Sequence, residues 1–149
     1  AADLPRLTYT RMVIDETLRY FAPAYQSMRH AAADTEIGGH AVAAGTDILF
    51  NSYLLHRHPE FWDDPERFDP TRFTPERIAA RHKYAYIPFG AGPRICLGKH
   101  FALTELTLMV ATIGRTHRLV RPEGRPDVAF DQVITLQPRG GVHLRLERR

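Results

Sequence analysis

The sequence has almost no cysteine: Cys96 is the only one among 149 residues. A lone cysteine excludes an internal disulfide and a multi-cysteine zinc site, and it is typical of a reducing compartment. No stretch approaches the ~18 consecutive apolar residues that a transmembrane helix needs. The N-terminus, AADLPRLTYT, lacks the basic and apolar arrangement of a secretory signal. We therefore expect a cytoplasmic protein, unless an N-terminal anchor precedes this chain.

The sequence also lacks any run of five like charges, although 20 Lys and Arg residues against 17 Asp and Glu residues give a net charge of +3. A pI near 9.3 would suit a nucleic-acid-binding protein. The basic residues, however, are mostly Arg and are dispersed among acids, so we expect no nucleic-acid partner. The 44% hydrophobic content is typical of one globular domain and excludes a disordered chain.

Apolar residues at helical spacing predict a helix over residues 8–20, which Pro23 ends. Glu16 interrupts one of its apolar stripes, and Arg19 follows three residues later on the same side. A buried carboxylate is costly unless it is paired. Two interpretations remain open: a buried Glu16–Arg19 ion pair, or an exposed helix pair worth ~0.3 kcal/mol.

The middle of the sequence predicts short strands, at residues 25–28, 35–37, 41–43 and 48–50. Ser52 is expected to cap a short helix after them. Residues 58–77 then combine near-regular prolines with large aromatic side chains. Proline excludes a sustained helix or central strand, whereas aromatic side chains favour burial. We therefore expect an ordered, packed coil.

A second helix is predicted over residues 98–113, with Gly114 as its stop. One apolar stripe runs along it, formed by Ala102, Leu106, Met109, Val110 and Ile113. The tail predicts strands at residues 119–120, 133–136 and 142–146, with a turn at 138–141.

The most informative stretch is PFGAGPRICLG, residues 88–98, which places the cysteine directly before the second helix. A helix N-terminus has free N–H groups and partial positive charge, which stabilise a thiolate. Glycines let the backbone approach a bulky group. Phe89 offers an aromatic wall, and Arg94 can hold a carboxylate through two parallel hydrogen bonds. These features predict a metal thiolate in a tight backbone cradle, beside an anion contact.

The same stretch matches the pattern F-x-x-G-x-R-x-C-x-G at Phe89, Gly92, Arg94, Cys96 and Gly98. It resembles the haem-binding signature of the cytochromes P-450, the haem-thiolate monooxygenases. The resemblance implies haem b as the cofactor and Cys96 as the axial ligand of its iron. It also implies that Phe89 packs near the sulfur, that Gly98 belongs to the cofactor site, and that Arg94 binds a haem propionate.

Two further motifs occur in the family's order. Glu16-x-x-Arg19 resembles the family's E-x-x-R motif, and Pro65-Glu66-Arg67-Phe68 resembles its P-E-R-F element. The resemblance implies that Glu16, Arg19 and Arg67 form a buried structural triad. It further implies that Arg29 is a second propionate partner, and that residues 21–27 and 133–136 line a substrate site.

The implied fold is α+β. Residues 1–149 would form a partial domain, the C-terminal haem-ligating part of the mostly helical cytochrome P-450 fold. The family's acid–alcohol pair lies on a distal helix before E-x-x-R, and only fifteen residues precede Glu16. We therefore expect that oxygen-activating helix to be absent from this chain.

Two interpretations of function follow from the resemblance. Either the full-length parent is a monooxygenase that inserts one atom of O2 into a small apolar substrate, with the isolated chain inactive, or the chain is a truncated haem-binding fragment. The implied electron donor is a ferredoxin, a flavodoxin or a flavin reductase. It would dock on a proximal basic patch, formed by Arg81, Lys83, Lys99 and His100; an ordinary solvated basic face is the alternative. For His56, a packed or capping role is favoured over contact with haem.

Overall fold

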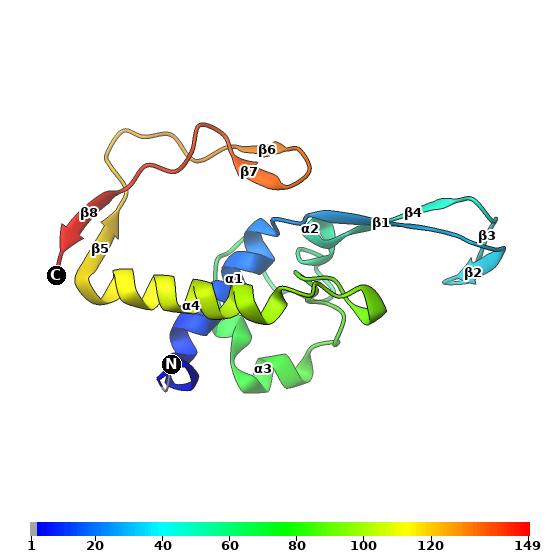
Figure 1. The fold of residues 1–149 in the computed structure, drawn as a ribbon, viewed down its shortest axis with the longest axis horizontal. Coiled ribbons are helices and arrows are strands. Elements are labelled where there is room, and N and C mark those ends of the chain that lie inside the picture. Colours follow the sequence, from blue (N-terminus) through cyan, green and yellow to red (C-terminus); the bar gives the residue numbers. More distant parts are fainter. Residues whose placement is uncertain (1–2) are drawn as a thin grey trace.

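The structure is a computed structural model and describes residues 3–149. Two helices lie at its centre, α1 (Thr8–Phe21) and α4 (Lys99–Thr116), and small sheets extend from them on two sides (Figure 1). The shorter helical elements are η1 (Leu4–Arg6), α2 (Ser52–Leu55), η2 (Pro70–Phe73), α3 (Pro75–Ala80) and η3 (Gly92–Arg94).

Every sheet in residues 3–149 is a two-stranded antiparallel pair. The pairs are β1 (Gln26–His30) with β4 (Asp47–Asn51), β2 (Thr35–Ile37) with β3 (His40–Val42), β5 (His117–Val120) with β8 (Arg145–Arg148), and β6 (Phe130–Gln132) with β7 (Leu136–Pro138). In the first pair Met28 lies opposite Leu49. This mixture of helices and small sheets confirms the predicted α+β class.

The two central helices end in different ways. After α1, Ala22 adopts a φ of +30° and donates its N–H to the Leu18 carbonyl, 3.0 Å away. α4 continues through Gly114 to Thr116, so the prediction that Gly114 stops the helix is wrong. One helical glycine costs only about 1 kcal/mol, and α4 packs on α1 and leads directly into β5.

The buried face of α4 is not the predicted apolar stripe. The side chains that this helix buries are those of Leu103 and Thr107, and the Thr107 hydroxyl donates to the Leu103 carbonyl at 2.6 Å. Met109, Val110 and Ile113, from the predicted stripe, are 40–52% exposed. α4 therefore presents much of its apolar surface away from this chain's own core.

Two short elements also differ from the sequence predictions. The cap of α2 is Asn51, whose side-chain oxygen accepts the Leu54 N–H at 2.9 Å, whereas Ser52 donates to the Ala24 carbonyl. Residues 133–136 were expected to be a strand, but residues 133–135 form the turn of the β6–β7 hairpin, and only Leu136 belongs to a strand, β7. In both cases adjacent residues suit the same cap or turn position, and contacts with other parts of the chain determine which residue occupies it.

Charged side chains occupy the centre of the core. Glu16 and Arg19 are completely buried, and Arg19 donates from Nε to Oε2 at 2.7 Å and from Nη2 to Oε1 at 2.9 Å. The complete burial of both side chains selects the buried ion pair over the exposed alternative. A carboxylate and a guanidinium removed from water require such complete pairing, because each unpaired charge would cost several kcal/mol.

Arg19 also fastens the coil to α1. Its Nη1 donates to the carbonyls of His56 and Pro65, at 2.8 and 2.9 Å, and its Nη2 donates to the Arg67 carbonyl at 3.3 Å. Glu16 Oε1 accepts the Asp69 N–H at 2.8 Å. The network thereby satisfies backbone groups that no helix or sheet pairs, and it gives the proline-rich segment the ordered packing expected of it.

The prediction that Arg67 is the third side chain of this network is wrong. Arg67 contributes only its backbone carbonyl, and the residue is exposed. Arg72 is buried instead, with Nε 3.5 Å from Glu16 Oε1 and Nη2 2.7 Å from the Asp64 carbonyl. The sequence holds two similar segments, Pro65-Glu66-Arg67-Phe68 and Pro70-Thr71-Arg72-Phe73, and η2 turns the second one toward α1.

The two arginines form a matched pair for mutagenesis. Arg72→Met removes a buried cation beside Glu16 and should lower the free energy of unfolding by about 3 kcal/mol. Arg67→Met should change it by less than about 0.5 kcal/mol, because the carbonyl that Arg19 uses remains. Urea titration of both variants measures the difference. Equal losses, or a larger loss in Arg67→Met, would contradict this placement.

Candidate functional site

The cysteine loop is closed by hydrogen bonds between its two ends. The Cys96 N–H donates to the Phe89 carbonyl at 2.9 Å, and the Gly90 N–H donates to the Ile87 carbonyl at the same distance. Gly90 and Gly92 have φ values of +73° and +71°. A side chain at either position would be strained, so these glycines are required by the loop's conformation.

Cys96 leads directly into α4. Its carbonyl accepts the Lys99 N–H at 3.3 Å, and its thiol is free and exposed. Gly98 has an ordinary φ of −79°, but a Cβ there would lie 3.9 Å from the Cys96 Sγ. A Cβ at this position would make an ordinary van der Waals contact with the sulfur, so glycine leaves the adjacent space free of side-chain atoms but is required neither by a clash nor by a strained turn.

The two arginines assigned to anion binding lie on different elements. Arg94 belongs to η3, two residues before the cysteine, and is exposed; its side chain makes no hydrogen bond or ion pair within residues 3–149. Arg29, on β1, is also exposed and donates to the Met28 carbonyl at 2.8 Å. Arg29 borders a mostly apolar cavity of about 400 Å³ that the loop residues Gly90 and Ala91 also line.

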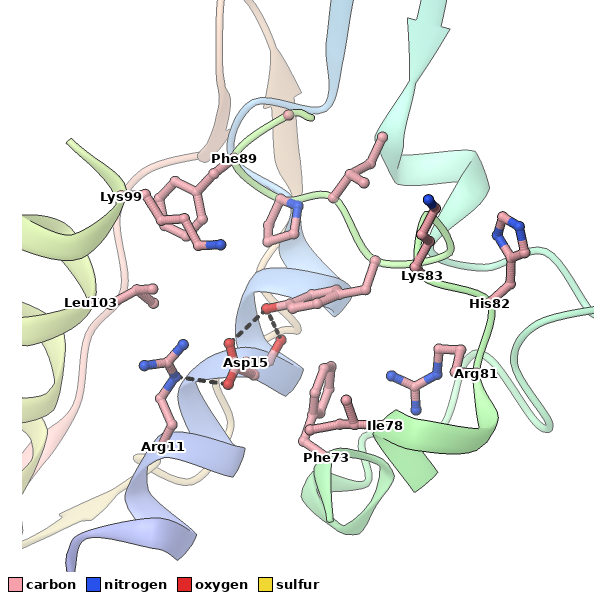
Figure 2. Close-up of a pocket in the computed structure, with 14 residues that line it drawn as sticks. Arg11, Asp15, Phe73, Ile78, Arg81, His82, Lys83, Phe89, Lys99 and Leu103 are labelled. Atoms are coloured by element: carbon pink, nitrogen blue, oxygen red, sulfur yellow. Dashed lines mark hydrogen bonds and ion pairs between the residues drawn. The ribbon is translucent and has the colours of Figure 1, made fainter. Parts of the chain in front are cut away.

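A second cavity, of about 260 Å³, lies beside the loop between α1, α3 and the start of α4. Figure 2 shows Phe89 directed into it, beside Lys99 and Leu103. On its α1 side, Tyr86 donates to the Asp15 carboxylate at 2.9 Å, and Arg11 donates to the other carboxylate oxygen at 2.8 Å (Figure 2). Burial, and then the Asp15 charge, raise the pKa of Tyr86 far above its ordinary value, so the hydroxyl remains a donor.

The structure separates the residues of the basic patch that was predicted to bind an electron donor. Arg81 and Lys83 line the second cavity together with Lys99, whereas His100 does not. Arg81 is only partly available, because its guanidinium lies 3.9 Å from the Trp62 ring centroid and donates to the Arg72 carbonyl at 2.6 Å. Lys99 is the member of the predicted patch closest along the chain to the cysteine.

The two segments predicted to line a substrate site lie side by side. The Leu136 N–H donates to the Pro23 carbonyl at 2.9 Å, and the Tyr25 hydroxyl donates to the Val133 carbonyl at 2.9 Å. The rings of Phe21 and Phe130 are 5.0 Å apart. The β6–β7 hairpin is thus fixed against the segment that follows α1.

One residue with a direct contact to the cysteine loop was not predicted as a site residue. His56 is completely buried, and its Nε2 accepts the Ile87 N–H at 2.9 Å. Burial lowers its pKa to about 4, and the charges of Arg19 and Arg57 add to this effect. The local sequence, YLLHRHP, favours a packed histidine but carries no signal for a partner 31 residues away.

Family comparison agrees with the motifs and with this geometry. The chain matches the family profile described as Cytochrome P450 over residues 1–145. It therefore belongs to the cytochrome P450 family.

Among curated relatives, Cyclooctat-9-en-7-ol 5-monooxygenase of Streptomyces melanosporofaciens is 50% identical over 117 residues, which are 78% of this chain and 26% of that protein. Cytochrome P450 4V2 of Mus musculus is 40% identical over 99% of this chain and 28% of its own length. The chain thus spans less than a third of the length of these relatives.

Solved structures give the same result for the fold. The crystal structure of the cytochrome P450DA heme domain matches 94% of this chain and 30% of its own, with a TM-score of 0.86 and 33% identity. The crystal structure of a cytochrome P450, CYP102L1, matches 99% of this chain and 33% of its own, with a TM-score of 0.89 and 32% identity. Within residues 3–149, no helix combines the length and apolarity needed to cross a bilayer.

Membership of the family implies a haem cofactor, and the residues present fit one. An exposed thiol sits on a rigid loop, and Ile95 and Leu97 beside it expose apolar side chains. Arg94 and Arg29 are exposed guanidinium groups that can hold carboxylates in two-bond contacts. A soft thiolate, apolar surroundings and two cations match a flat apolar ring that carries iron and two carboxylates.

The buried His56 predicts a pH-dependent stability. Its folded-state pKa of about 4 lies below the ordinary 6.5, so between these values the unfolded chain binds a proton that the folded chain excludes. The contribution of neutral His56 to the free energy of unfolding is therefore fully present above about pH 6.5. This free energy decreases as the pH falls toward 4, by about 3 kcal/mol in total. Urea titrations across this range measure the slope. His56→Gln, which does not titrate there, should have a shallower slope; an unchanged slope would show that another group is responsible.

Proposed function

We propose that this chain is the haem-ligating part of a haem-thiolate monooxygenase, in which the Cys96 Sγ would bind the haem iron. The observation that carries the proposal is the exposed Cys96 thiol, on a loop closed by the Cys96–Phe89 hydrogen bond directly before α4. The haem b that we propose there would, when bound, activate O2 and transfer one oxygen atom to an organic substrate.

Cys96 would supply its sulfur to the iron from the loop directly before α4. The glycine at position 98 leaves room beside the sulfur for a flat group. Ile95 and Leu97, 45% and 101% exposed, would be covered by that group and would keep water away from the thiolate.

Arg94 and Arg29 would orient the cofactor by binding its propionates. Arg94 is two residues from the ligand, so one propionate contact would be fixed to the same loop as the iron bond. Arg29 comes from β1 and lines the same cavity as Gly90 and Ala91. Contacts on two separate elements would fix the rotation of the ring as well as its position.

The proposed substrate is a small apolar molecule, and residues 21–27 and 133–136 are the proposed lining. Their aromatic and aliphatic side chains support this assignment, since Val133 and Ile134 are 55% and 95% exposed at the tip of the hairpin. The 50% identical relative is named for oxidation of cyclooctat-9-en-7-ol. We extend only the apolar character of that compound to the substrate of this protein.

The proposed electron donor is a ferredoxin, a flavodoxin or a flavin reductase with an acidic docking surface. Lys83 and Lys99 support this proposal, because both line the cavity into which Phe89 is directed (Figure 2). Complementary charge of this kind accelerates association and decreases in effect with added salt.

We propose the complete activity for a protein as long as the relatives, of which this chain would form the partial, haem-ligating domain. The alternative is a haem-binding fragment with no oxygen activation of its own. The exposed Met109, Val110 and Ile113 on α4 favour the alternative for these residues taken alone, because residues 3–149 leave 40–52% of each uncovered. Turnover by the purified chain that is lost in Cys96→Ala would exclude the alternative.

Two substitutions separate iron ligation from cofactor retention. In the parent protein, Cys96→Ala should abolish the thiolate-type absorption spectrum of the ferrous carbonyl complex. Arg94→Leu should preserve that spectrum but accelerate haem loss about tenfold or more, because it removes a charge-assisted contact and not the iron bond. Haem transfer to an apoprotein acceptor measures the loss. A thiolate-type spectrum in Cys96→Ala would reject the assignment of the ligand.

A further inference from the structure

His56 accepts hydrogen bonds from two different parts of the molecule. Its backbone carbonyl accepts from Arg19 Nη1 at 2.8 Å, and Arg19 belongs to the buried ion pair on α1. Its side chain accepts the Ile87 N–H at 2.9 Å, at the entry to the cysteine loop. One residue therefore connects the charged core to the segment that carries the proposed iron ligand.

The path from His56 to the cysteine combines hydrogen bonds with short steps along the chain. Ile87, held by the imidazole, accepts the Gly90 N–H at 2.9 Å through its carbonyl. Phe89, between these two residues, accepts the Cys96 N–H at 2.9 Å. A displacement of Ile87 would therefore reach the backbone of Cys96 through a tightly closed turn, without a flexible linker to absorb it.

The surroundings of His56 leave its ring little freedom. Its ring centroid lies 5.4 Å from that of Tyr86 and 6.4 Å from that of Trp62, and the residue is completely buried. Because an N–H group donates to Nε2, the imidazole must carry its proton on Nδ1. Arg19 and Arg57 are the charged groups that face it, and both oppose a second proton.

We propose that His56 is a positioning residue for the thiolate: its neutral Nε2 fixes Ile87, and Ile87 fixes the loop that aims the Cys96 sulfur. This role rests on the proposed function, since it presumes that Cys96 ligates haem iron. It assigns His56 no contact with haem or substrate. A packing role would depend on the shape of the side chain, whereas this role depends on a hydrogen-bond acceptor at the position of Nε2.

A pair of amide variants tests the acceptor. In His56→Gln the side-chain oxygen can reach the position of Nε2, whereas in His56→Asn it can reach only that of Nδ1. The haem-loaded parent protein should keep a thiolate-type ferrous carbonyl band in His56→Gln, and the band should decay at close to the wild-type rate. In His56→Asn the band should convert to the non-thiolate type about tenfold faster, with haem content unchanged, because a buried N–H loses its acceptor.

Equal decay in wild type, His56→Gln and His56→Asn would overturn this role while leaving the ligation by Cys96 intact. A wild-type parent without a thiolate-type band would overturn the proposed function and this role together. Hydrogen exchange of the wild-type protein provides a measurement that needs no variant to fold. The Ile87 amide should exchange at least about tenfold more slowly than the amide of Arg125, an exposed residue between β5 and β6 and outside the proposed haem site. Equal exchange of the two amides would overturn the proposed contact.

Discussion

The arrangement of this chain depends on the buried ion pair between Glu16 and Arg19. Two fully desolvated charges are tolerated only when every polar atom is occupied, and here the partners are backbone groups of residues 56–69 together with Arg72. This requirement explains how a proline-rich coil without sheet pairing can be ordered. The coil supplies the carbonyls that the guanidinium needs, and the guanidinium supplies the donors that those carbonyls would otherwise take from water.

Aromatic packing also stabilises the proline-rich coil. Trp62 is buried between Phe73, 6.0 Å away between ring centroids, and the guanidinium of Arg81, 3.9 Å from its ring. Tyr86 packs on Phe73 at 4.8 Å and bonds to Asp15 of α1. This region is therefore held to α1 by the ion pair of Glu16 and Arg19 and by the hydrogen bond from the Tyr86 phenol to Asp15. The cysteine loop begins one residue after that phenol.

Local patterns predicted the elements that local forces determine. The helical spacing of apolar residues predicted α1, and the spacing of glycine and cysteine in residues 89–98 predicted the loop and the family. The choice between Arg67 and Arg72 was not predictable, because both follow a proline by two residues and precede a phenylalanine. Burial of Phe73, 5% exposed against 44% for Phe68, decides it, and that depends on Trp62 and Tyr86. The role of His56 depends likewise on a contact across 31 residues.

Two sets of contacts constrain the position of Cys96, and both lead to α1. On one side, Ile87 and Phe89 connect it through His56 to Arg19. On the other side, α4 begins three residues after Cys96, and this helix packs against α1. A movement of α1 would therefore displace both ends of the loop together and preserve its shape, whereas loss of one connection would let the two ends move apart. Under the role proposed for His56, charges that do not touch the sulfur would therefore help to determine its position through the backbone of the loop.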